Sequence, residues 1–207
     1  MQSTLTQIRE HKIIAIIRGV KPGDILNIVH ALYEGGICVL EITLNSQGAL
    51  KSIQDIESKW GDIITVGAGT VMDCDSAKAA IGVGAKFIIS PIVDAETIRV
   101  TKRNGIVSIP GAFTPSEIVQ AYAHGGDIIK VFPAPSLSYF KNLFGPFQHI
   151  PLMPTGGIDL ENIGEFKKAG AVAFGIGSAL VDAKQEITDE YLNNIKIRAE
   201  QFIKAIQ

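Results

Sequence analysis

Two charged residues stand inside apolar segments of the sequence. Glu41 lies in the segment Val-Leu-Glu-Ile-Thr, and Lys130 lies in the segment Ile-Ile-Lys-Val-Phe. A charge in such a segment needs an explanation, because burying a charge costs free energy unless the group is paired or has a function. One explanation is a solvated strand edge or a structural ion pair. The other is a catalytic pair, and finding two such residues in one chain favours it.

The catalytic interpretation makes Lys130 a nucleophile. Burial in a dry site disfavours the ammonium form and lowers the pKa of a lysine, so the neutral amine can attack a carbonyl carbon and form a Schiff base. The protonated imine then accepts electrons from the adjacent carbon, while Glu41, directly or through a water molecule, moves protons. A direct ion pair would raise the pKa of Lys130, so we expect the two groups to be separated or bridged by water.

Short apolar segments rich in β-branched residues recur along the chain and predict eight strands. They are residues 13–17, 39–44, 63–66, 87–89, 106–109, 128–132, 150–153 and 172–176. Segments with helical spacing lie between them, and several end in glycine, as helices often do. Apolar strands that alternate with helices are typical of parallel sheets. The sequence therefore predicts an α/β fold, a closed (β/α)8 TIM barrel, with an open doubly wound sheet as the alternative.

The chain length fits a single barrel domain over residues 1–207, in which 46% of the residues are hydrophobic. The first dozen residues predict a short N-terminal helical cap, and residues 188–206 predict the last outer helix. Helices cover the outside of such a barrel, so a charge in the middle of a strand is expected to point inward. We therefore expect Glu41 and Lys130 to share the interior.

Other candidate residues fall at the ends of predicted strands, where barrel enzymes hold their substrates. Arg18 ends the first strand, and its two parallel donors match a carboxylate, although a surface turn residue is the alternative. The glycine run at residues 66–70 is expected to end the third strand and to leave room for a ligand, with Thr70 offering a hydroxyl. Its Gly-x-Gly lacks the rest of a dinucleotide-binding motif, so we expect no nicotinamide cofactor.

Glycine-rich turns follow the last two predicted strands, at residues 154–159 and 175–178, and we expect each of them to enter a helix. Backbone N–H groups in such turns bind anions, and these two loops form the usual phosphate site of a barrel. Tight turns without a ligand are the alternative.

In combination these motifs resemble the family of 2-keto-3-deoxy-6-phosphogluconate and 2-keto-3-deoxy-6-phosphogalactonate aldolases, which are class I pyruvate aldolases. The motifs are IIRG at 16–19, LEITL at 40–44, VGAGTV at 66–71, ISP at 89–91, IPG at 109–111, KVFPA at 130–134 and PTGGI at 154–158. The resemblance spans about residues 13–182 and implies a (β/α)8 barrel that assembles as a homotrimer. It also implies cleavage of a phosphorylated 2-keto-3-deoxy sugar acid to pyruvate and glyceraldehyde 3-phosphate without a cofactor.

The resemblance also implies roles for individual residues. Lys130 is similar to the Schiff-base lysine of the family, and Glu41 is similar to its proton-shuttling residue. The substrate-binding positions that it implies are Thr70 for the pyruvate carboxylate, Pro91 and Phe132 as pocket walls, and Gly156, Gly157, Gly177 and Ser178 for the phosphate.

Two substrate markers disagree. Asn45 follows the glutamate strand where gluconate-type members often carry an arginine, and the arginine is instead Arg18, which resembles the galactonate type. Thr155, however, resembles the gluconate type at a substrate-binding position. The resemblance therefore leaves the preferred epimer at C4 open.

Composition excludes several other classes of protein. The net charge of -2 and the scattered 19 Lys and Arg residues provide no field for nucleic acid. Cys38 and Cys74 are expected to be free thiols, and neither they nor the four histidines have metal-ligand spacing, so we expect no metal. No leader and no apolar run of about 18 residues is present, which predicts a soluble, cytoplasmic protein without membrane contact.

Two other functions remain as alternatives. A phosphosugar isomerase could use the same phosphate loops, with Lys130 as an electrostatic group. A catalytically silent barrel could bind a sugar phosphate as a sensor or scaffold. A binding module gains little from a buried carboxylate near a desolvated amine, so the pair of Glu41 and Lys130 argues against the silent barrel.

Overall fold

The computed structural model describes residues 3–207, in which strands and helices alternate. The strands are β1 (Ile13–Ile17), β2 (Val39–Thr43), β3 (Thr65–Gly69), β4 (Phe87–Ile89), β5 (Val107–Ile109), β6 (Gly111–Ala112), β7 (Ile129–Val131), β8 (Leu152–Pro154) and β9 (Phe174–Ile176). The helices are α1 (Thr4–His11), α2 (Ile25–Glu34), α3 (Ala49–Trp60), α4 (Cys74–Gly82), α5 (Ala95–Arg103), α6 (Pro115–Ala123), α7 (Leu137–Phe147), α8 (Ile163–Lys168) and α9 (Asp189–Ala205), with a short 3₁₀ turn, η1 (Pro22–Asp24), before α2.

The strands form two parallel sheets. The larger sheet has six strands in the order β5-β4-β3-β2-β1-β9, and the smaller has three in the order β6-β7-β8. The predicted closed eight-stranded (β/α)8 TIM barrel is therefore wrong. The fold is an α/β arrangement in which a curled half-barrel of six strands stands beside a separate three-stranded sheet.

The two sheets adjoin at two places. Pro110 separates β5 from β6, and a proline has no N–H to continue a ladder of hydrogen bonds. The predicted strand at 106–109 is thus β5, and the chain enters the second sheet directly after Pro110. On the other side, β8 and β9 are linked by an isolated bridge between Thr155 and Gly175. One of these two places therefore includes Thr155, which is a predicted site residue.

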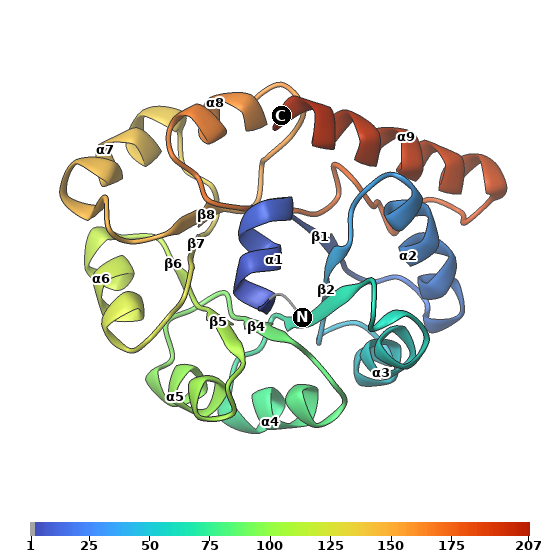
Figure 1. The fold of residues 1–207 in the computed structure, drawn as a ribbon, viewed down its shortest axis with the longest axis horizontal. Coiled ribbons are helices and arrows are strands. Elements are labelled where there is room, and N and C mark those ends of the chain that lie inside the picture. The colour runs from blue at the N-terminus through green and yellow to red at the C-terminus, as the bar shows by residue number, and fades with distance from the viewer. Residues whose placement is uncertain (1–2) are drawn as a thin grey trace.

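Both sheets contribute to one apolar interior. A cluster of fully or nearly buried side chains joins residues of both sheets with α1, namely Ile8, Ile14, Val39, Phe87, Ile89, Val107, Ile109, Ile128, Met153 and Ala173. The alternate residues of the strands pack outward against the helices in a second, larger cluster. Figure 1 shows α2 to α9 around the outside of the strands. Both faces of the strands are therefore buried, which explains why their sequences are continuous apolar runs.

Both ends of the described chain are helical. Helix α1 lies over the middle of the strands in Figure 1, and its Gln7 accepts a hydrogen bond of 2.5 Å from the hydroxyl of Thr65 at the start of β3. Residues 1 and 2 of the predicted cap lie outside the described residues. Helix α9 begins after Thr188, whose hydroxyl accepts from the N–H of Tyr191, and its C-cap is Ile206.

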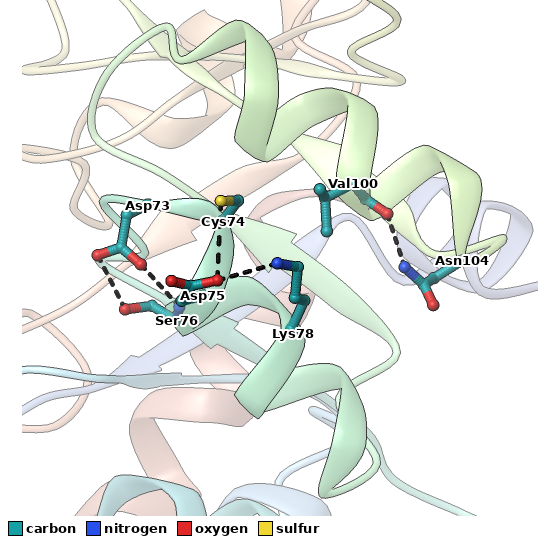
Figure 2. Close-up of polar contacts among 7 residues, drawn as sticks. All are labelled: Asp73, Cys74, Asp75, Ser76, Lys78, Val100 and Asn104. Carbon is teal, nitrogen blue, oxygen red and sulfur yellow. Dashed lines mark hydrogen bonds and ion pairs between the residues drawn. The ribbon is translucent and has the colours of Figure 1, made fainter.

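Side-chain caps fix the ends of the outer helices. Figure 2 shows Asp73 at the N-terminus of α4, where its carboxylate accepts from the N–H of Ser76 at 2.7 Å. At the end of α5 the amide of Asn104 donates to the carbonyl oxygen of Val100 at 2.8 Å. Such caps satisfy backbone groups that the helix itself leaves free, and each contributes on the order of 1 kcal/mol.

Both cysteines are free thiols, as predicted. Among the residues that the structure describes, no helix combines the length and the apolar character needed to cross a membrane.

Candidate active site

Glu41 and Lys130 lie on the inner side of their strands. In β2, Glu41 is two residues from Val39 of the interior cluster and so shares its face, and in β7, Lys130 is likewise two residues from Ile128 of that cluster. Glu41 is 1% exposed and Lys130 is 3% exposed. Because the two strands belong to different sheets, the interior between the sheets brings the carboxylate and the amine together.

Gly69 makes the space that the Glu41 carboxylate occupies. A Cβ atom added at Gly69 would lie within 2.2 Å of the carboxyl carbon of Glu41, so no other residue fits there with this carboxylate in place. Gly67 likewise leaves the space that the Phe87 ring occupies, because that ring would lie within 2.5 Å of a Cβ added at Gly67. The glycine run ends β3, as we expected, but at Gly67 and Gly69 it does not leave room for a ligand. It forms the strand, and side chains fill the space.

The pKa of Lys130 is lowered, as predicted for a Schiff-base nucleophile. Burial is the main cause, because the ammonium form loses its hydration, and the positive charge of Arg18 lowers the pKa further. The charge of Glu41 acts in the opposite direction and raises it. Burial therefore outweighs the attraction of the carboxylate, which favours the neutral amine.

The pKa of Glu41 is raised. Burial is again the main cause, and the charges of Lys130 and Arg18 partly oppose it. Within the described residues 3–207, neither carboxylate oxygen of Glu41 has a hydrogen-bond partner, so no direct hydrogen bond joins it to Lys130. A carboxylate that is buried and unpartnered is free to exchange a proton with a bound molecule or a water.

Arg18 and Thr70 lie together at the mouth of the interior. The guanidinium of Arg18 donates to the hydroxyl of Thr70 at 3.3 Å. Thr70 has φ of 56°, a left-handed conformation that is strained for a β-branched residue. Strain of this kind clusters at functional sites, where the surrounding structure holds it.

The two residues predicted as pocket walls follow the ends of two strands. Phe132 follows β7 and is 38% exposed, and its ring centroid lies 4.7 Å from the Lys130 nitrogen. Pro91 follows β4, and its backbone is so near Gly111 that a Cβ there would lie 2.5 Å from the Pro91 carbonyl carbon. An apolar wall beside the amine supports its neutral form, although a cation over a ring face also gains some attraction.

Thr155 lies at the seam between the sheets. Its side chain is 3% exposed, and within the described chain its hydroxyl has no hydrogen-bond partner. Gly175 of β9 gives it room, because an added Cβ would lie 2.5 Å from that hydroxyl oxygen. A buried hydroxyl without a partner costs free energy, so this group is available to a polar atom of a ligand.

The turn after β8 presents two glycines in the left-handed conformation, with φ of 83° at Gly156 and 81° at Gly157. Their carbonyl oxygens accept from the N–H of Ala134 at 3.2 Å and from the amide of Asn162 at 2.7 Å. Neither glycine N–H donates a hydrogen bond within residues 3–207. Two free N–H groups beside each other suit an anion.

The expected helix N-termini behind these turns are absent. Helix α8 begins at Ile163, several residues after the glycines, and residues 177–188 separate β9 from α9. Gly177 instead starts a local turn, with its carbonyl accepting from Leu180 and Val181, and Ser178 is exposed at its edge. Any anion there is held by backbone N–H and hydroxyl groups without a helix dipole. Within the described residues, no group of three or more His, Cys, Asp or Glu side chains is placed to hold a metal ion.

The chain is similar to known aldolases along nearly its whole length. A family model described as "Aldolase: KDPG and KHG aldolase" matches residues 5–197. A 2-dehydro-3-deoxy-phosphogluconate aldolase of Pseudomonas aeruginosa is 35% identical over 164 residues, which cover 78% of this chain and 74% of the relative.

Two solved structures share the fold. One, described as "Native KDPGal structure", has a TM-score of 0.87 and 32% identity and covers 93% of each chain. The other is KDPG aldolase from Legionella pneumophila with pyruvate captured as a covalent carbinolamine intermediate, with a TM-score of 0.81 and 26% identity. It covers 100% of this chain and 98% of the Legionella chain.

Proposed function

Since the chain belongs to the KDPG and KHG aldolase family, and is thus a class I aldolase and a lyase, we propose that it cleaves a 2-keto-3-deoxy-6-phospho sugar acid to pyruvate and glyceraldehyde 3-phosphate. The observation that carries the proposal is Lys130, a buried lysine with a lowered pKa that shares an interior with the buried carboxylate of Glu41. A carbinolamine with pyruvate is an intermediate of this same chemistry in the Legionella enzyme.

In the proposed reaction the neutral amine of Lys130 adds to the C2 carbonyl of the substrate and forms a carbinolamine. Loss of water gives a protonated imine. Glu41, directly or through a water, then takes the proton of the C4 hydroxyl, the bond between C3 and C4 breaks, and the electron pair moves into an enamine as the aldehyde leaves. The proton returns to C3, and water hydrolyses the imine to release pyruvate and restore the amine.

The remaining residues bind the two ends of the substrate. Arg18 and Thr70, which contact each other at the mouth, hold the carboxylate next to the carbonyl that Lys130 attacks. Phe132 and Pro91 form the walls of the pocket. The free N–H groups of Gly156 and Gly157, with the exposed turn at Gly177 and Ser178, bind the phosphate.

Thr155 contacts the sugar hydroxyls between these two ends, through the hydroxyl that has no partner in the described chain. Its neighbourhood therefore bears on which C4 epimer is preferred. Relatives of both kinds match this chain, at 35% identity for the gluconate enzyme and 32% for the KDPGal structure, so overall identity does not separate them.

Incubation of the protein with pyruvate and borohydride tests the proposal. Borohydride reduces the imine to a stable amine, so peptide mass spectrometry should place a reduced pyruvyl group on Lys130. Release of pyruvate from the gluconate and the galactonate substrates, measured with a coupled dehydrogenase, gives the epimer preference in the same preparation. No adduct and no turnover of either epimer would remove the proposal.

We extend the proposal to a homotrimer in the cytoplasm. Three exposed apolar side chains follow strand ends on the substrate side, namely Met72, Ile92 and Phe113, each at least 41% exposed, and subunit contact would cover them. Phosphorylated substrates do not cross membranes freely, which favours the cytoplasm. Sedimentation velocity should give a mass of three times 22.2 kDa, and a species of one or two chains would contradict the trimer.

A further inference from the structure

A row of hydroxyl groups links the loop that carries Arg18 to the end of β2. The N–H of Gly19, next to Arg18, donates to the hydroxyl oxygen of Ser46 at 2.8 Å. That oxygen lies 2.9 Å from the hydroxyl oxygen of Thr43, which is fully buried at the end of β2. The hydroxyl of Thr43 in turn donates to the carbonyl oxygen of Ile17 by a longer contact of 3.5 Å.

The chemistry of the two ends fixes the direction of this row. A backbone N–H only donates and a carbonyl oxygen only accepts, whereas a hydroxyl does both. The N–H of Gly19 therefore donates to the Ser46 hydroxyl, the Ser46 hydroxyl donates to that of Thr43, and the Thr43 hydroxyl donates to the carbonyl oxygen of Ile17. The row begins at the residue after Arg18 and ends at the residue before it, so it holds the backbone on both sides of Arg18.

Arg18 needs such support, because little else holds it. The residue is exposed, follows directly after β1, and precedes Gly19, whose φ of 70° ends the extended conformation. Its guanidinium has a single hydrogen bond within the described chain, the contact of 3.3 Å with Thr70. A guanidinium can donate two parallel hydrogen bonds to a carboxylate only when the backbone that carries it is fixed, because misalignment by about 1 Å is costly.

We propose that Ser46 is a positioning residue that aims Arg18 at the substrate carboxylate, through the N–H of Gly19 and the hydroxyl of Thr43. The inference rests on the proposed function, in which Arg18 binds that carboxylate. Ser46 touches no substrate. Its turn is itself fixed to β2, because its N–H donates to the carbonyl oxygen of Thr43 at 2.9 Å.

The first experiment compares Ser46→Ala, which removes the hydroxyl, with Ser46→Thr, which keeps it. The readout is exchange of the methyl protons of pyruvate for deuterium, followed by NMR. Ser46→Ala should raise the KM for pyruvate by roughly 10-fold and change kcat by less than about 2-fold, the pattern of lost binding rather than lost chemistry. Ser46→Thr should keep a KM near the wild-type value.

Ser52→Ala is the matched control. Ser52 lies in α3, where its hydroxyl donates to the carbonyl oxygen of Gly48 at 3.1 Å and takes no part in the row from Gly19 to Ile17. Its loss removes a hydroxyl of the same chemistry from the same part of the chain, so KM should not change. A Ser52→Ala variant with the same rise in KM would overturn the inference, because the effect of Ser46 would then be general destabilisation.

A double-mutant cycle gives the sharpest test. If Ser46 acts through Arg18, Ser46→Ala should raise KM by less than about 2-fold in an Arg18→Lys background, because the two parallel donors of the guanidinium are already absent. A 10-fold rise in both backgrounds, or none in the wild-type background, overturns the inference. Absence of borohydride trapping with pyruvate in the wild-type protein would instead remove the proposed function, so the two failures are distinguishable.

Discussion

The two sheets of this protein divide the proposed chemistry between them. The six-stranded sheet carries Glu41 in β2 and ends in Arg18 and Thr70 after β1 and β3. The three-stranded sheet carries Lys130 in β7 and ends in Phe132. One sheet therefore supplies the groups that move protons and hold a carboxylate, and the other supplies the nucleophile.

The sheets also differ in how they are built. The paired strands β1, β2 and β3 are each five residues long, whereas β6, β7 and β8 have two or three residues. The longer ladder holds Glu41 by close packing against Gly69. The shorter one holds the backbone of Lys130 by its N–H, which donates to the carbonyl oxygen of Pro110 at 2.9 Å, and by the bonds of its chain neighbours Ile129 and Val131 on the β8 side. Substitutions in the two sheets should therefore affect different steps of the proposed reaction, imine formation in one case and proton transfer or carboxylate binding in the other.

The largest effect is expected in the three-stranded sheet. Lys130→Arg keeps a charge but has no neutral primary amine, so it should abolish borohydride trapping with pyruvate and reduce turnover by roughly 10⁴-fold or more. Lys168→Arg, at an exposed position of α8, is the control and should trap pyruvate like the wild type. An adduct of normal yield in the Lys130→Arg protein would show that another amine forms the imine.

The second-largest effect is expected in the six-stranded sheet, from a substitution that leaves every charged residue in place. Gly69→Ala places a methyl group where the Glu41 carboxylate lies, so the carboxylate must move. Deuterium exchange at the pyruvate methyl group should slow by roughly 100-fold, as it should in Glu41→Gln, because a general acid–base is lost or misplaced. Imine trapping on Lys130 should persist in both.

Gly82→Ala provides the control for that change. Gly82 ends α4, and an added Cβ there meets nothing within 4 Å. Its exchange rate should equal that of the wild type. If Gly69→Ala also exchanges at the wild-type rate, packing of Glu41 against β3 does not set its position, and the contrast between the sheets fails.

Part of this arrangement follows from sequence alone, because alternation along a strand is a local rule. Glu41 and Lys130 are each surrounded by apolar residues, so their inward direction could be predicted before any sheet was known. The limits of α9 were also predictable, since Thr188 is a typical N-cap residue. A pattern of neighbours along the chain was sufficient for these features.

Features that depend on how distant segments meet could not be predicted. The sheet does not close at Pro110, nor between β8 and β9, which only the single Thr155–Gly175 bridge links within the described residues. A sequence pattern of eight apolar runs says nothing about which strands pair. The role of Gly69 was missed for the same reason. A glycine pair shows that space is needed, but only the fold shows that Glu41 and Phe87 fill it.

A third, smaller effect separates the charge of Arg18 from its shape. The positive charge of Arg18 lowers the pKa of Lys130, so Arg18→Gln should raise that pKa and move the acid limb of imine formation to higher pH. Arg18→Lys keeps the charge and should leave the limb in place. Both changes should raise the KM for pyruvate by roughly 10- to 100-fold, because the two parallel donors are lost.

The measurement is the rate of borohydride trapping against pH at low pyruvate concentration. An equal shift of the acid limb in Arg18→Lys and Arg18→Gln would mean that shape rather than charge controls the pKa of Lys130. An unchanged KM in Arg18→Lys would show that the carboxylate is held elsewhere in the six-stranded sheet, with Thr70 as the next residue to test.

The smallest effect concerns Thr70, where stability and binding should move in opposite directions. Its left-handed φ of 56° costs a non-glycine residue about 1–2 kcal/mol, and a glycine recovers this but loses about 0.4–1 kcal/mol through the unfolded chain. Thr70→Gly should therefore raise the free energy of unfolding by about 0.5–1 kcal/mol, or Tm by roughly 1–4 °C. The KM for pyruvate should rise severalfold, because Arg18 loses its hydrogen bond of 3.3 Å.

Lys12→Gly separates relief of strain from loss of the hydroxyl. Lys12 is the other non-glycine residue with positive φ within residues 3–207, at 60°, and it caps α1 on the side of the sheets away from Arg18. It should give a similar gain in Tm by differential scanning calorimetry with no change in KM. If Thr70→Gly gains stability and keeps the wild-type KM, the strained residue is not part of the carboxylate site. If it loses stability, Thr70 contributes more to folding than its strain costs, and the six-stranded sheet would be held at its mouth by the same contact that we assign to binding.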